Sequence, residues 1–170
     1  TRYSPLDQIN AGNFSKLQLA WRFKTDMFGP RAEFNYQATP LMANGRLYTV
    51  AGTRRAAVAL DAATGELLWM HSIDEGKRGA AAPRLLSGRG LSYWTDGKDE
   101  RVIYVTPGYQ MVALDAKTGD RVRNFGADGI VDLKQNYDQE GIDLETAEVG
   151  LHSAPIIAKD VIVIGAAHRE

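Results

Sequence analysis

Acidic side chains are the first candidates for chemistry in this sequence. Five of them lie between residues 134 and 149: Asp138, Glu140, Asp143, Glu145 and Glu148. Carboxylate oxygens are the ligands that Ca²⁺ prefers, but this spacing does not match an EF-hand loop. We therefore interpret the segment as a solvated surface loop and keep a calcium loop as the alternative.

Asp61 and Asp115 each stand in a motif that could supply a catalytic base. Their surroundings are nearly identical, because Val-Ala-Leu-Asp-Ala-Ala-Thr-Gly-Glu at 58–66 returns as Val-Ala-Leu-Asp-Ala-Lys-Thr-Gly-Asp at 112–120. A catalytic base is needed once, whereas a structural turn recurs with every repeat. The duplication predicts that both aspartates shape turns.

Composition excludes several other kinds of site. The chain has no cysteine, which excludes disulfides, thiolate metal sites, a cysteine nucleophile and covalent haem attachment through C-x-x-C-H within these 170 residues. Twenty Lys and Arg against 21 Asp and Glu give a net charge of -1, so we predict no nucleic-acid partner. Hydrophobic residues make up 44%, and no apolar run approaches the ~18 residues of a membrane span.

The elements that position these residues belong to a repeat. The period from Val58 to Val112 is 54 residues, and Ala-Thr-Pro at 38–40 has a counterpart in Ser-Ala-Pro at 153–155, about two periods later. Each unit is expected to hold four short strands joined by turns. Asn44-Gly45 predicts a tight hairpin between the first two strands, because both residues tolerate a positive φ. The strands are expected at 38–42, 47–51, 56–60 and 67–73, then at 91–95, 102–106, 111–114 and 122–125; the one weak helix candidate is 11–19.

Repeated four-stranded antiparallel units indicate an all-β fold built of β-propeller blades. We expect one partial propeller domain over residues 1–170, with about 2.5 blades at 37–73, 91–125 and 153–170 and an acidic insertion at 132–150. Such a fragment leaves two apolar faces open, so the chain is expected to be the N-terminal piece of a longer protein. The tryptophans at 21, 69 and 94 are predicted to pack between blades.

Several segments resemble the N-terminal third of the pyrroloquinoline quinone (PQQ) dependent dehydrogenases, which are eight-bladed propeller enzymes that oxidise alcohols or sugars. The similar segments are Tyr-Ser-Pro-Leu-Asp-Gln-Ile-Asn at 3–10, Leu-Ala-Trp-Arg-Phe at 19–23, the two Ala-Leu-Asp-Ala-x-Thr-Gly turns, and Ser-Gly-Arg-Gly-Leu-Ser-Tyr-Trp at 87–94. The resemblance covers essentially the whole chain. It implies that residues 20–25 form the closing strand of the last blade and that the protein is periplasmic, its signal peptide not present in this chain.

The resemblance also implies which residues hold the cofactor. Gln37 stands where the family has a glutamate that hydrogen-bonds the quinone, and Arg89 would form a forked pair with one of the three PQQ carboxylates. His152 stands at a family hydroxyl position, with Ser153 beside it. Ala167 stands where many members have a serine.

The resemblance assigns Glu170 as a ligand of Ca²⁺, or of another hard divalent or trivalent cation. Methanol-oxidising members cover the quinone with a disulfide of adjacent cysteines, whereas this chain has Pro83 and Arg84 there. His71 and His168 are given no role.

The implied reaction is hydride transfer from an alcohol to PQQ, with Ca²⁺ as Lewis acid and a cytochrome or a membrane quinone as electron acceptor. No catalytic residue is expected within this chain, because the base, the stacking tryptophan and further metal ligands belong to the missing blades. The 170 residues alone are therefore predicted to be inactive. Two alternatives stay open: a quinoprotein that oxidises sugars or polyols, and a non-enzymatic propeller for protein assembly or binding.

Overall fold

The computed structural model describes residues 6–25, 28–135 and 141–168, and these confirm the all-β prediction. Two four-stranded antiparallel sheets have their strands in sequence order. The first sheet holds β1 (Leu41–Ala43), β2 (Arg46–Ala51), β3 (Ala56–Asp61) and β4 (Leu67–His71). The second sheet holds β5 (Ser92–Thr95), β6 (Glu100–Val105), β7 (Gln110–Asp115) and β8 (Ile130–Asp132).

The C-terminal part adds two short antiparallel pairs. Strands β10 (Ile156–Ala158) and β11 (Val161–Val163) form a hairpin, and β9 (Val149–Gly150) pairs with β12 (Ala167–His168). A short helix, α1 (Gly76–Ala80), lies between the two sheets in sequence. No helix in the described ranges is long and apolar enough to cross a membrane.

The repeated turns form as the sequence predicts. Asn44 and Gly45 have φ values of 48° and 74°, which suits the tight hairpin between β1 and β2. Asp61 Oδ1 accepts hydrogen bonds from the backbone N–H groups of residues 63 and 64 at 2.9 and 2.8 Å, and Asp115 Oδ1 does the same at residues 117 and 118. Both aspartates therefore shape turns, as their duplication indicates.

Two local predictions are wrong. The fourth strand of the second sheet is Ile130–Asp132 rather than residues 122–125. Arg121 still bridges to β7, but Gly126 and Gly129 adopt positive φ values of 56° and 88°, so the chain leaves the sheet and returns at residue 130. The weak helix candidate at 11–19 contains a single 3-10 turn, Phe14–Lys16.

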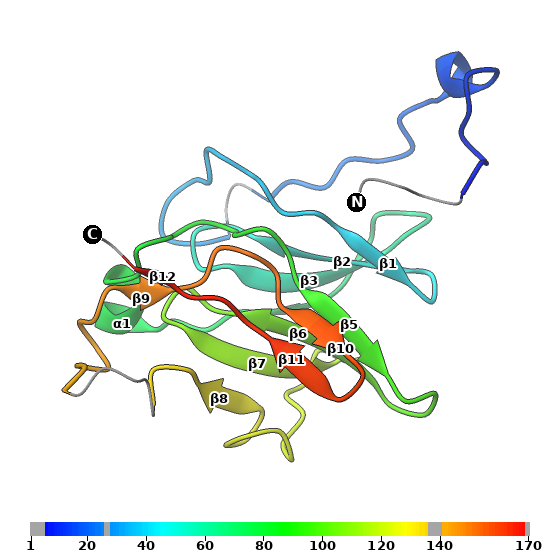
Figure 1. The fold of residues 1–170 in the computed structure, drawn as a ribbon. Helices are drawn as coiled ribbons and strands as arrows, with labels where there is room; N and C mark the ends of the chain where they lie inside the picture. Colours follow the sequence, from blue (N-terminus) through cyan, green and yellow to red (C-terminus); the bar gives the residue numbers. More distant parts are fainter. Residues whose placement is uncertain (1–5, 26–27, 136–140, 169–170) are drawn as a thin grey trace.

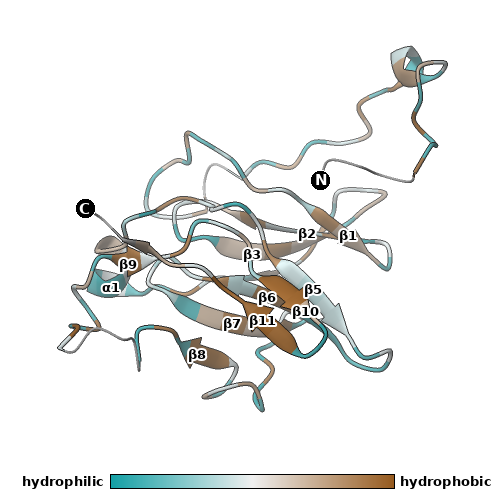
Figure 2. Cartoon of the chain, viewed as in Figure 1, coloured by the Kyte–Doolittle hydropathy of each residue, from teal (hydrophilic) through white to brown (hydrophobic). Residues whose placement is uncertain are grey.

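Two hydrophobic cores hold the layers together. The first lies between the two sheets and includes Tyr48, Trp69, Tyr104 and Leu114. The second lies between the second sheet and the β10–β11 hairpin, where Ile157 and Ile162 pack onto it. Along the hairpin these residues alternate with Ile156, Val161 and Val163, which are exposed. Both strands of the hairpin are hydrophobic (Figure 2), and the hairpin therefore presents an uncovered apolar face.

The first strands of successive units lie next to one another. Strand β1 contacts β5, and β5 contacts β10, while the remaining strands of each sheet extend away from them (Figure 1). Strands β1, β5 and β10 are thus the inner strands of three consecutive blades, and the segments that precede them lie close together.

One tryptophan joins the two sheets, and a second repeats its contacts. Trp69 Nε1 donates to the Ala116 carbonyl (3.1 Å), and its ring lies where a Cβ on Gly119 would come within 2.7 Å. Trp21 Nε1 donates to the Ala62 carbonyl (3.2 Å), and its ring lies against Gly65 in the same way. Residues 20–25 have no assigned strand, yet Trp21 binds the turn of the first sheet as Trp69 binds the turn of the second. Trp94 differs, because it is half-buried beneath the Arg101 guanidinium.

Candidate functional site

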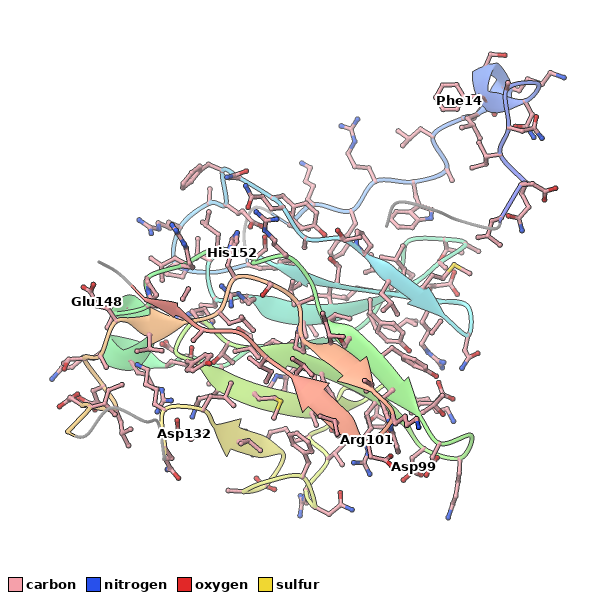
Figure 3. The ribbon with its side chains drawn as sticks, viewed as in Figure 1. Phe14, Asp99, Arg101, Asp132, Glu148 and His152 are labelled. Carbon is pink, nitrogen blue, oxygen red and sulfur yellow. The ribbon has the colours of Figure 1, made fainter. Side chains whose placement is uncertain are left out.

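Three of the predicted cofactor residues come from the segments that precede the inner strands, and these segments are hydrogen-bonded to one another. The Thr39 backbone N–H donates to the Arg89 carbonyl (3.0 Å), and the Arg89 N–H donates to the His152 carbonyl (2.9 Å). Figure 3 labels His152 at the place where the loop before β5 passes the segment before β10. Gln37, Arg89 and His152 therefore occupy corresponding places in three consecutive blades.

The side chains of Gln37 and His152 are also in contact. His152 Nε2 donates to Gln37 Oε1 at 2.9 Å. This bond places the proton of the neutral imidazole on Nε2 and leaves Nδ1 as an acceptor. Among the described residues, His152 Nδ1 is buried and has no hydrogen-bond partner. The site thus contains a buried acceptor that no described group of this chain satisfies.

The site has an excess of positive charge. Burial lowers the pKa of the His152 imidazole below its ordinary value of 6.5, and three neighbouring cations lower it further. These cations are Arg55, Arg89 and Arg84. The guanidinium groups of Arg84 and Arg89 are exposed, and within the described ranges no carboxylate pairs with either of them. A neutral imidazole beside unpaired guanidinium groups suits an anionic ligand.

Two residues that the sequence analysis did not select hold this arrangement in place. Arg55 is buried, and its guanidinium donates to four backbone carbonyls around the site. Glu33 accepts hydrogen bonds from the backbone N–H groups of Gly52 (2.9 Å) and Ser87 (3.0 Å). Arg55 follows another arginine in a turn, and nothing in its sequence context shows that it is the buried one of the two.

The other predicted site residues are less closely joined. Ser153 is exposed and follows His152 directly. Ala167 is half-buried in β12 and pairs with Gly150, two residues before His152. Glu170 lies outside the described residues, so its assignment to the metal stays a prediction. Across the described ranges, no group of three or more Asp, Glu or His side chains converges as a metal site would require.

The acidic insertion is organised around a lysine. Lys134 is fully buried, and its Nζ donates to the carbonyls of Leu144 (3.3 Å) and Ala147 (2.9 Å). Asp143 Oδ1 accepts two backbone N–H groups of its own turn. In the described part of the insertion, the Lys134 ammonium group therefore bonds two carbonyl oxygens that would otherwise be available to a metal cation. Asp138 and Glu140 lie outside the described residues.

Comparisons with known proteins relate the whole chain to one family. The profile of the family described as "PQQ: Glucose/ethanol/alcohol dehydrogenase, beta-propeller domain" matches residues 1–170. The dehydrogenase subunit of a quinone alcohol dehydrogenase from Gluconobacter oxydans (strain 621H) is 36% identical over 96% of this chain and 19% of its own length.

Solved structures agree with the sequence match. The quinohemoprotein alcohol dehydrogenase ADHIIG from Pseudomonas putida HK5 gives a TM-score of 0.72 at 27% identity, over 98% of this chain and 21% of that one. A europium-containing methanol dehydrogenase gives 0.70 at 25% identity, over 99% of this chain and 26% of that one. The chain thus spans about a fifth to a quarter of the length of the proteins that it matches.

Proposed function

Because the chain belongs to the PQQ-dependent glucose/ethanol/alcohol dehydrogenase β-propeller family, we propose that the whole protein oxidises an alcohol with PQQ and that this chain supplies one side of the cofactor site. The observation that carries the proposal is the convergence of Gln37, Arg89 and His152 from three blades, joined by hydrogen bonds of 2.9 to 3.0 Å. The family relation suggests a site at this position, and the side chains found there have the chemistry to bind an anion.

The described residues fit a tricarboxylated ring. Arg89 and Arg84 carry guanidinium groups without a carboxylate partner in the described ranges, and Arg55 adds a buried positive charge. The orphaned Nδ1 of His152 can accept a hydrogen bond from the ligand. When bound, PQQ would supply the hydride acceptor that the oxidation of an alcohol requires and that no protein side chain provides.

Each residue then has a defined task. Arg89 would hold a carboxylate of the cofactor, because a planar guanidinium is suited to pair with that group. Gln37 keeps the proton of His152 on Nε2, so that Nδ1 remains an acceptor. Because Gln37 is neutral, it adds no negative charge to repel an anionic ligand.

A hard cation is part of the same proposal. Ca²⁺, or another hard divalent or trivalent cation, acts as a Lewis acid in such a site, and Glu170 is the ligand that this chain would contribute. The acidic insertion is not proposed as a second calcium site, because Lys134 occupies the carbonyls of its described part.

Two features, one near each end of this chain, support the completion of the propeller by further blades. The exposed face of the β10–β11 hairpin needs a covering sheet, and Trp21 binds the first sheet as an outer strand of a preceding blade would. Residues 20–25 are therefore proposed to close the last blade. We further propose that the whole protein is periplasmic and passes electrons to a cytochrome or a membrane quinone, and that residues 1–170 alone do not turn over.

The test uses the full-length protein with added PQQ and Ca²⁺. Dye-linked oxidation is assayed with alcohols, sugars and polyols, and PQQ binding is measured by fluorescence titration. The Arg89→Ala variant is expected to bind PQQ roughly tenfold to a hundredfold more weakly, because it loses a charged hydrogen bond. The matched control is Arg54→Ala, since Arg54 is exposed and pairs with Asp74 instead.

The outcomes separate the candidate functions. If only sugars or polyols are oxidised, the proposed substrate class changes, and the assignment as a PQQ-dependent dehydrogenase stands. Equal PQQ affinity of wild type and Arg89→Ala would contradict the proposed site. Absence of PQQ binding by the wild type would favour an assembly propeller.

A further inference from the structure

We propose that Arg55 is a positioning residue of the candidate cofactor site, whose guanidinium fastens the loop that carries Arg89 to the segment that carries His152. The identity of the ligand as PQQ rests on the proposed function, whereas the contacts of Arg55 do not depend on that function. The four hydrogen bonds of the Arg55 guanidinium all go to backbone carbonyls, so it acts through the backbone.

The guanidinium binds three segments that are far apart in the sequence. Its Nε donates to the Leu86 carbonyl at 3.2 Å, and one Nη donates to the Arg84 carbonyl at 3.0 Å. Its other Nη donates to the carbonyls of Val105 (3.1 Å) and Leu151 (2.6 Å). Leu86 lies three residues before Arg89, and Leu151 directly precedes His152. A single side chain thus joins the two loops whose backbones also meet at Arg89 and His152.

The surroundings of Arg55 are shaped for this group. Arg55 is 3% exposed, and burial lowers the pKa of its guanidinium to about 10. The guanidinium therefore remains a cation at neutral pH. Four neutral carbonyls, rather than a directly bonded carboxylate, accept four of its five N–H donors. Gly88 lies against it, because a Cβ at that position would come within 2.8 Å of Nε. The loop therefore packs directly on the guanidinium.

The buried charge also acts on the site. Arg55 is one of the three cations that disfavour protonation of His152. Burial is the main cause of the lowered pKa of His152, and Arg55, Arg89 and Arg84 lower it further while keeping the local potential positive. Both effects favour an anionic ligand, and neither depends on contact between Arg55 and that ligand.

Neighbouring Arg54 provides a natural control. It has the same side chain and lies in the same turn, but it is exposed and pairs with Asp74 at 2.5 Å. Replacing Arg54 removes a surface charge, whereas replacing Arg55 removes the link between the two loops.

Three variants of the full-length protein separate the roles of shape and charge. Arg55→Lys keeps the positive charge but lacks the planar guanidinium that reaches several carbonyls. Arg55→Met removes both the charge and the guanidinium. Arg54→Met is the control. The measurements are hydrogen exchange of the Thr39 and Arg89 amides and the pKa of His152 by NMR, both without cofactor, followed by PQQ affinity.

We expect both Arg55 variants to exchange the Thr39 and Arg89 amides faster and to bind PQQ about tenfold more weakly, which is a typical coupling between distant groups. The pKa of His152 should rise in Arg55→Met and stay close to wild type in Arg55→Lys, a difference that a purely structural role would not produce. Arg54→Met should match the wild type in all three measurements.

Unchanged amide exchange and unchanged PQQ affinity in Arg55→Lys would overturn the inference. If neither Arg55 variant folds, the test uses Gly88→Ala, whose Cβ would displace the Arg55 guanidinium without removing it. A PQQ affinity of Gly88→Ala equal to that of the wild type would also overturn the inference. Failure of the wild type to bind PQQ would instead reject the proposed function, while the exchange rates and the His152 pKa would still decide the role of Arg55.

Discussion

The two four-stranded sheets have the same repeated turn after their third strand but differ in the outer strand that follows it. After Gly65, the first sheet continues directly into β4, which carries Trp69 into the core between the sheets. After Gly119, the second sheet makes one bridge at Arg121, leaves the ladder and pairs again only at β8. A conserved local turn therefore does not determine the strand that follows it.

The difference lies in what each outer strand contacts. Four residues after the turn glycine, the first sheet has Trp69, which binds the turn of its neighbour through a hydrogen bond and a ring contact. At the same place the second sheet has Arg123, whose side chain is 91% exposed. The outer strand is continuous, apart from one register shift between Ala59 and Leu60 of β3, where it carries a group that docks on the next sheet. It is interrupted where it carries no such group.

The largest expected effect comes from removing the docking group. Trp69→Ala should lower the free energy of unfolding by about 3–5 kcal/mol, because a buried indole and its hydrogen bond are both lost. Arg123→Ala, at the corresponding place in the second sheet, should leave it nearly unchanged. Chemical denaturation of the full-length protein measures both, and equal losses would show that the docking contact does not distinguish the sheets.

A smaller effect is expected from the glycine beneath the indole. Gly119→Ala meets both a positive φ of 78° and the Trp69 ring, whereas Gly45→Ala meets a positive φ of 74° with open space around it. The Gly45 variant should lose about 1–2 kcal/mol from backbone strain alone, and the Gly119 variant about 1–3 kcal/mol more. Thermal unfolding of the pair gives the difference, and a zero difference would mean that the indole moves aside without cost.

The smallest effect is a pH dependence that only the first sheet should show. His71, six residues after its turn glycine, bonds through Nδ1 to the Tyr104 hydroxyl of the second sheet (3.0 Å), and the second sheet has the non-titrating Phe125 at that place. Burial lowers the pKa of His71 below its ordinary value of 6.5, and the charge of Arg121 lowers it further. The folded state thus favours the neutral ring.

This stabilisation is fully present above pH 6.5 and is lost as the pH falls through the folded-state pKa of His71. His71→Gln should therefore lose less stability than the wild type between about pH 7 and about pH 5. Unfolding curves across that range test the difference, and parallel curves would contradict it. His152 titrates in both proteins and cancels in the comparison.

The sequence predicts features that depend on a few adjacent residues, and it predicts only some of the contacts between distant segments. Asp61 and Asp115 each act within their own turn, so their role follows from a few adjacent residues. The repeat places Gln37 and His152 at equivalent positions, directly before Ala-Thr-Pro and Ser-Ala-Pro. That these residues and Arg89 form a cofactor site could be expected only from a resemblance to a family, because the repeat does not show which side chains bind a ligand.

The failures have a common physical cause. Residues 122–125 have the side chains of a strand, but the glycines at 126 and 129 let the chain turn away before a ladder forms. Arg54 and Arg55 are the same residue in the same turn, and only the packed loops decide which is buried. In both cases, tertiary contacts select among local conformations that the sequence alone allows.

The candidate site takes one residue from the same structural place in three successive units, and main-chain bonds hold those places together whatever side chain each carries. An amide, a guanidinium and an imidazole now occupy them. A substitution at any one of the three places therefore changes the chemistry offered to a ligand and leaves these main-chain bonds in place.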